Sequence, residues 1–189
     1  MKKTLIILFI IFTFVSCTSK LYNYKTAMTY PVQNSDLIYE NDTLKIGFKL
    51  NPKDILVNIR NKSETGIKIN WDELSFSINA KTYRIVHKET GVIKINEVQP
   101  PTTIPPHSVL DDILVPAQNV KSNYSIYFNT YLTHVDDIFP NNDYGFKAKR
   151  EYIQSMKGGT ITIFLPFYMD GKYVSKYYTL NIIDVYKKK

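Results

Sequence analysis

The sequence predicts an all-β fold, an antiparallel β-sandwich with one short helical insertion. Fifteen of its 189 residues are Tyr and ten are Phe, and such large flat side chains favour pleated sheets. Apolar and polar residues alternate in roughly seven to nine short runs, with turn residues about every 8–12 positions. No long helical period separates these runs, which excludes a parallel α/β sheet. A hydrophobic content of 44% also excludes a disordered chain.

The N-terminus is typical of an export signal. Two lysines precede an apolar stretch that runs from Leu5 to Val15. This stretch is shorter than the roughly 20 apolar residues that cross a bilayer, so it predicts a signal peptide and not a membrane span. Cys17, the only cysteine of the chain, follows it after a small residue, Ser16.

This pattern resembles the lipobox of bacterial, Bacteroidota-type lipoproteins, with Phe14 where such motifs most often carry Leu. The resemblance implies that residues 1–16 are removed and that Cys17 is acylated, which makes membrane lipid a partner. Thr18–Tyr22 lacks the acidic cluster that resembles a surface-export signal in these lipoproteins. We therefore expect a lipid-anchored, periplasm-facing position at the bacterial outer membrane.

Three parts follow from this pattern: a signal peptide over 1–16, the lipidated cysteine with a tether over 17–35, and a sandwich domain over 36–189. The tether is expected because Thr18–Ser35 shows no apolar periodicity. The net charge of +7 comes from scattered lysines. Nucleic-acid binders cluster such charge on one face or motif, so a nucleic-acid partner is not expected.

The first strands of the domain are predicted from alternation. Leu37–Asn41 and Leu44–Leu50 flank a turn, and Ile55–Ile59 alternates again after the turn at Asn51–Asp54.

A bend and a hairpin are predicted next. The apolar positions change parity at Asp72–Glu73, which a strand accommodates only with a bulge or bend. With Ala80 and Lys81 as the following loop, Ile78 is expected to face Tyr83.

Prolines and glycines divide the middle of the chain. Gln99–His107 holds four prolines and is expected to run as extended chain over the surface. Ser108–Val115 and Tyr124–His134 each predict one strand. Residues 136–158 form the insertion, in which Lys147–Met156 predicts a helix that ends before two glycines.

The last hairpin supplies the candidate binding face. Asp170–Gly171 is a two-residue turn signal, and Pro166 is expected at an edge or bulge. The register set by this turn places four aromatic residues on one side of the ribbon: Phe164, Tyr168, Tyr173 and Tyr177. Two readings remain open. The rings form an exposed platform for a sugar ring or peptide, or the 136–158 insertion or the tether covers them and makes a second core.

The order of elements also resembles the single immunoglobulin-like domain of small bacterial lipoproteins and the related LEA14-like domains. The similar stretches are Asn58–Ser63, Asn70–Leu74 and Thr103–Ser108. The resemblance implies a binding or spacer module and lowers the expectation of catalysis.

No residue pattern predicts a catalytic centre, a metal site or a cofactor. The three histidines lie on separate segments, and His134 with Asp136 and Asp137 lacks a second half of a metal site. Asp42-Thr43-Leu44 matches the sequon of Bacteroidota periplasmic glycosylation, which makes Thr43 a candidate for O-glycosylation. The expected function is a non-catalytic binding or interaction module of the cell envelope, with an unknown protein, peptide or glycan as partner. The alternative is a structural or accessory subunit of an envelope assembly.

Overall fold

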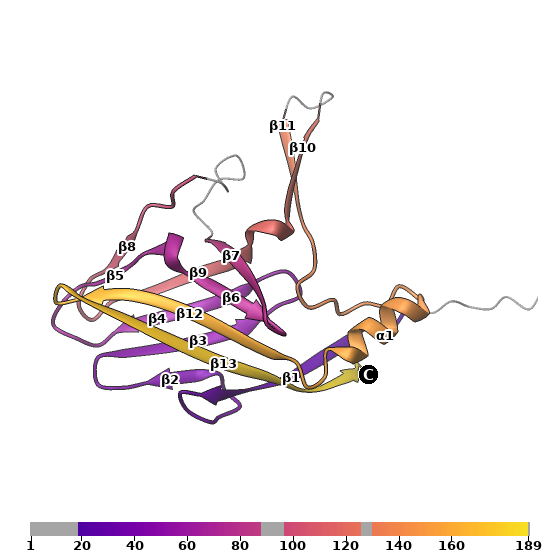
Figure 1. The fold of residues 1–189 in the computed structure, drawn as a ribbon, viewed down its shortest axis with the longest axis horizontal. Helices are drawn as coiled ribbons and strands as arrows, with labels where there is room; N and C mark the ends of the chain where they lie inside the picture. Colours follow the sequence, from indigo (N-terminus) through magenta and orange to yellow (C-terminus); the bar gives the residue numbers. More distant parts are fainter. Residues whose placement is uncertain (1–18, 88–96, 126–129, 189) are drawn as a thin grey trace, which may run out of the picture.

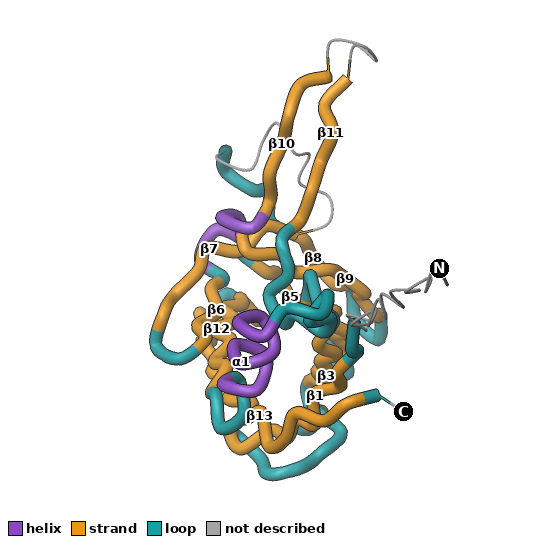
Figure 2. Tube along the Cα trace, turned by 90° about the vertical axis from the view of Figure 1, so that its right-hand side faces the viewer, coloured by secondary structure: helices purple, strands orange, loops and turns teal. Residues whose placement is uncertain are grey.

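Two antiparallel layers of strands face each other across one apolar core (Figures 1 and 2). The computed structural model describes residues 19–87, 97–125 and 130–188. The predicted fold class, an all-β antiparallel sandwich with one helix, is confirmed.

The first layer is built around the last hairpin of the chain. Its strands, in spatial order, are β1 (Tyr22–Tyr30), β13 (Lys172–Lys187), β12 (Thr160–Met169) and β6 (Ser75–Ile78). Beside the turn end of β12, this layer continues through β5 (Ile67–Ile69) and β8 (Thr102–Ile104).

The second layer is linked to the first through one shared strand. β7 (Lys81–His87) pairs with β6 on one side and β9 on the other. From there the order is β9 (Val109–Pro116), β4 (Ile55–Asn61), β3 (Leu44–Leu50) and β2 (Ile38–Glu40).

Two elements lie outside the layers. β10 (Val120–Ser125) and β11 (Thr130–Val135) form a separate hairpin that projects from the body (Figure 1). The helix α1 (Lys147–Ser155) packs at the end where β1 begins and β13 ends, and it buries Ile153 there.

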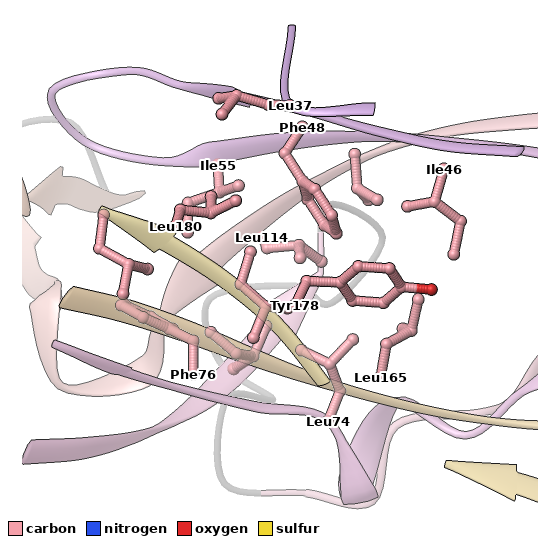
Figure 3. Close-up of a cluster of buried hydrophobic side chains, with 14 of the residues drawn as sticks. Leu37, Ile46, Phe48, Ile55, Leu74, Phe76, Leu114, Leu165, Tyr178 and Leu180 are labelled. Atoms are coloured by element: carbon pink, nitrogen blue, oxygen red, sulfur yellow. The ribbon is translucent and has the colours of Figure 1, made fainter. Parts of the chain in front are cut away.

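The core lies between the inner faces of the two layers (Figure 3). Tyr178 of β13 connects them, because its ring contacts Phe48 of β3 at 5.1 Å and Tyr39 of β2 at 5.8 Å between centroids. Burial among these rings raises the pKa of Tyr178 far above its ordinary value.

The hairpin register and the bend are confirmed. Asp170 and Gly171 both have positive φ, and β12 pairs with β13 in the predicted register, Tyr168 opposite Tyr173. The parity change at Asp72–Glu73 is a 3-10 turn over Trp71–Glu73, between β5 and β6. Pro166 lies in a part of β12 that pairs with neither β5 nor β6. Its missing N–H therefore removes no hydrogen bond from the pairing of β12 with these two strands.

The tether prediction is wrong for most of its length. Tyr22–Tyr30 forms β1, which pairs with β13 along the edge of the first layer. Its inner positions carry Tyr22, Tyr24 and Met28 in place of an aliphatic alternation. Cys17 and the rest of residues 1–18 lie outside the described residues.

Three finer predictions are also corrected. The loop of the β6–β7 hairpin is Asn79–Ala80, both with positive φ, so Ile78 faces Lys81 and Phe76 faces Tyr83. The proline-rich segment contains β8, because Thr102–Ile104 retains free N–H groups between the proline pairs.

The segment from Tyr124 to His134 belongs to a two-stranded hairpin and not to one strand. The described residues hold thirteen strands in all, more than expected, since three-residue strands such as β2, β5 and β8 show no readable pattern.

Candidate functional site

Four aromatic residues line the outer face of the β12–β13 hairpin, and we call them the aromatic ladder: Phe164, Tyr168, Tyr173 and Tyr177. They form two cross-strand pairs. The Phe164 and Tyr177 centroids lie 4.9 Å apart with ring planes inclined by 38°. The Tyr168 and Tyr173 centroids lie 5.3 Å apart in an edge-to-face arrangement. Successive side chains of a strand point to opposite faces of the sheet. The residues that alternate with the four rings point into the core, so the rings themselves point outward.

The aromatic ladder is open to solvent. Tyr173 is 49% exposed and Tyr177 is 52% exposed, while their partners on β12 are half-buried. The reading in which the 136–158 insertion or the tether covers these rings is wrong for residues 19–35 and 136–158, the parts of the two segments that the structure describes. The helix α1 lies at the opposite end of the hairpin (Figure 1), and β1 pairs only with the part of β13 beyond Tyr177.

An acidic side chain borders the aromatic ladder. Glu73, at the end of the 3-10 turn, accepts a hydrogen bond from Asn70 Nδ2 at 2.7 Å. Desolvation among its neighbours, and then the Glu73 charge beside its hydroxyl, raise the pKa of Tyr173. The sequence does not place Glu73 beside Tyr173, because the approach of the two residues depends on the bend between β5 and β6.

A hollow of about 550 Å³ lies on the outer face of the second layer. Its floor is Gly47 of β3, which is flanked by Ile38 of β2 and Asn58 of β4. A methyl group placed on Gly47 meets its nearest neighbour, Ile38 Cγ1, at 3.7 Å, an ordinary contact. The rim carries both charge signs, from residues that include Lys45, Lys49, Asp36 and Asp111. The hollow therefore indicates no particular ligand charge. The sequence signal for it is a glycine at an outward position of an alternating strand.

His87 and Asp112 form a buried pair inside the sandwich. His87 Nδ1 lies 3.2 Å from Asp112 Oδ2, and the imidazole stacks on Trp71 with 4.5 Å between centroids. His87 is 3% exposed. Among the described residues its Nε2 has no hydrogen-bond partner, yet this atom is closed off from solvent. A substrate does not reach this nitrogen without rearrangement of the core, so we assign the pair to the packing around Trp71.

Asp143 is fully buried where β1 begins, and its carboxylate accepts four hydrogen bonds. The backbone N–H groups of Lys20 and Gly145 donate to Oδ1 at 2.7 and 2.9 Å. Tyr22 Oη and Arg150 Nε donate to Oδ2 at 3.2 and 2.9 Å. Led by the Gly145 amide, these donors hold the pKa of Asp143 far below its ordinary value, although burial alone raises it. We call this arrangement the Asp143 clasp.

The remaining sequence candidates lie apart from the aromatic ladder. Thr43 is half-buried in the turn between β2 and β3, and its hydroxyl donates to Asn41 Oδ1 at 3.0 Å. Asp136 pairs with Lys121 at 2.6 Å, and the side chain of His134 lies outside the described residues. Over the described ranges, no group of three His, Cys, Asp or Glu side chains is placed to hold a metal ion.

No protein-family model matches the chain, and no curated protein matches it either. In the part of the chain that the structure describes, no helix has the length and apolarity needed to cross a membrane.

Proposed function

We propose that this protein is a lipid-anchored, non-catalytic binding module of the bacterial cell envelope, and that its ligand contacts the aromatic ladder. The observation that carries the proposal is an outer sheet face on which two aromatic pairs stay open to solvent. Large rigid rings gain contact area at low entropic cost, which suits them to binding. The lipobox-like sequence before Cys17 supports the anchor.

A glycan is the ligand class that this face fits best. Sugar rings stack on aromatic faces, and hydroxyl-bearing side chains lie on the same face beside the rings, from Thr162 on β12 and Ser75 on β6. The two ring pairs are four residues apart along the strand, a distance of about 13 Å. A ligand that reaches both pairs must therefore be extended, as an oligosaccharide is.

Removal of the two exposed rings tests the ligand face. The double variant Tyr173→Ala/Tyr177→Ala is expected to lose binding to envelope polysaccharide by at least about fivefold, since each aromatic contact contributes roughly 0.5–1.5 kcal/mol. Its melting temperature is expected to fall by only a few degrees, because both rings are half exposed and each gives up one cross-strand ring contact. The measurements are a glycan array followed by calorimetric titration, and thermal unfolding by circular dichroism.

The matched control is Tyr144→Ala/Tyr152→Ala, which removes two tyrosines that are 55% and 56% exposed near α1. This control is expected to bind as the unaltered chain does. Equal binding by all three proteins would contradict the assignment of the aromatic ladder. Binding of an apolar peptide and of no glycan would keep the face but change the ligand class.

Replacement of Cys17 tests the anchor. Cys17→Ala is expected to move the protein from the membrane fraction to the soluble fraction and to abolish labelling by a fatty-acid probe, because only the cysteine thiol accepts the diacylglycerol. Ser16→Ala, which leaves the thiol in place, is the control. Labelling of the Cys17→Ala protein at the unaltered level would refute lipidation at this residue.

A second candidate function, a structural or accessory subunit of an envelope assembly, is favoured by the projecting β10–β11 hairpin. This two-stranded ribbon pairs with no other described strand (Figure 1). Its backbone edges are therefore available for pairing with a strand of another protein. A stoichiometric protein partner recovered from detergent-solubilised envelope would favour this function over glycan binding.

A further inference from the structure

The start and the end of the described chain meet at one end of the molecule. The Lys188 amide donates to the Leu21 carbonyl at 2.8 Å, and the Tyr22 amide donates to the Asn141 carbonyl at 2.7 Å. The loop before α1 lies against the same point, through the Asp143 amide and the Lys20 carbonyl at 3.1 Å. Figures 1 and 2 show α1 and the C-terminus at this end, away from the turn of the β12–β13 hairpin.

This end is strongly basic. A shallow hollow of about 420 Å³ is lined by Ser19, Lys20, Leu21, Lys187 and Lys188. The nearby Lys187 charge, followed by Arg150, lowers the pKa of Lys20, as expected when like charges are crowded together. Asp143 is fully buried and bonded to four donors, so it presents no open negative charge here.

Apolar side chains are exposed among these lysines. Leu21 is 45% exposed and Phe146, next to the Asp143 clasp, is 67% exposed. The Phe146 amide donates to the Asp143 carbonyl at 2.8 Å, which holds the Phe146 backbone close to Asp143, the residue to whose carboxylate the Lys20 amide also donates. Lysines around exposed Leu and Phe side chains are the composition of surfaces that lie in a membrane interface. We call Lys20, Leu21, Phe146, Lys187 and Lys188 the basic end.

We propose that the basic end lies against the surface of a bilayer that contains anionic phospholipids. The inference rests on the proposed function for one element only, the anchor at Cys17. Two residues separate Cys17 from Lys20, and a fully extended chain gains at most about 3.6 Å per residue. The anchor therefore holds Lys20 within about a Debye length of the lipid headgroups, where attraction between lysines and anionic lipids acts. The turn end of the β12–β13 hairpin, where Tyr168 pairs with Tyr173, then lies far from the membrane.

Lysine reactivity on vesicles tests this orientation. The full lipidated chain is reconstituted into phosphatidylcholine vesicles with and without 30% phosphatidylglycerol, acetylated briefly, and mapped by mass spectrometry. Lys20, Lys147 and Lys187 are expected to react at least about fivefold more slowly on the anionic vesicles. Attraction to the anionic headgroups favours the lipid-bound, protonated form of each lysine by about this factor. Lys68 and Lys172, which are exposed at the hairpin-turn end, serve as internal controls with unchanged rates.

A charge-reversal variant distinguishes contact of the basic end with anionic lipid from protection that arises only because the anchor holds the chain near the vesicle. In Lys20→Glu/Lys187→Glu/Lys188→Glu, the protection of Lys147 on anionic vesicles is expected to disappear. In the control Lys68→Glu/Lys172→Glu it is expected to persist. Equal lysine rates on both kinds of vesicle, or protection that survives the triple reversal, would overturn the proposal.

The intact mass of the purified chain keeps the two proposals distinguishable. A mass without acyl chains on Cys17 would refute the anchor of the proposed function. In that case, the same lysine map in the presence of added anionic vesicles still decides whether the basic end contacts them.

Discussion

Replacement of Trp71 by alanine is expected to lower the free energy of unfolding by about 3–5 kcal/mol. Trp71 is 1% exposed, and its indole stacks on the imidazole of His87. Its Nε1 donates to Thr102 Oγ1 at 2.8 Å, which ties the 3-10 turn to β8. The alanine variant leaves a cavity beside a buried His–Asp pair. Urea denaturation followed by circular dichroism measures the loss.

A companion variant separates packing from hydrogen bonding at Trp71. Thr102→Val removes only the acceptor of the indole N–H and is expected to cost about 1 kcal/mol. If Trp71→Ala cost no more than Thr102→Val, the stacking of the indole on His87 would not stabilise the fold. The assignment of this cluster to core packing would then be wrong.

Replacement of Asp143 by asparagine is expected to lower the melting temperature at pH 7 by on the order of 10 °C. The substitution removes the charge that Arg150 faces and alters an acceptor for four donors from three segments of chain. Since Lys20 and Tyr22 are two of these donors, we expect β1 to become the least protected strand. Amide hydrogen exchange along β1 checks this expectation.

The pH dependence of the Asp143 clasp has a definite sign. The pKa of Asp143 is lower in the folded state than its ordinary value of 3.8. The stabilisation is therefore complete above about pH 4 and is lost as the pH falls further toward the folded-state pKa. The difference in melting temperature between Asp143→Asn and the unaltered chain is expected to shrink below about pH 4. A difference that stays constant from pH 7 to pH 3 would contradict this role of the carboxylate. Glu151→Gln, which alters an exposed carboxylate on α1, is the control.

Turn chemistry explains why one hairpin register was readable from the sequence and another was not. Asp170–Gly171 is a strong signal for a two-residue turn with positive φ, so the pairing of Tyr168 with Tyr173 followed from it. Asn79–Ala80 adopts a similar turn without a glycine. Nothing local distinguishes it from a loop one residue later, at Ala80–Lys81. That shift moves the partner of Ile78 by two residues, from Lys81 to Tyr83, so the predicted partner was wrong.

The strand β1 was missed because tyrosines stand at inner positions where alternating aliphatic residues would be expected. Tyr22 and Tyr24 occupy inner positions, and their hydroxyls donate to the Asp143 carboxylate and the Pro140 carbonyl, both more than 100 residues away. A sequence pattern shows the polar atom of a tyrosine but not its distant acceptor. The outer hollow at Gly47 was missed for a similar reason, since it needs four strands side by side.

The pairing of β1 with β13 also decides how the molecule resists mechanical force. β1 runs antiparallel to β13 from Tyr22 to Tyr30, so a pull on the chain at Lys20 acts along the strand axis. Such a load stretches many inter-strand hydrogen bonds together, in shear, and does not open them one after another. The neighbouring Arg150–Asp143 contact, at 2.9 Å, lies at the point where the tension enters. The edge strand β1, which the sequence presents as a flexible tether, thus transmits tensile load from the N-terminal segment to the sheet that carries the aromatic ladder.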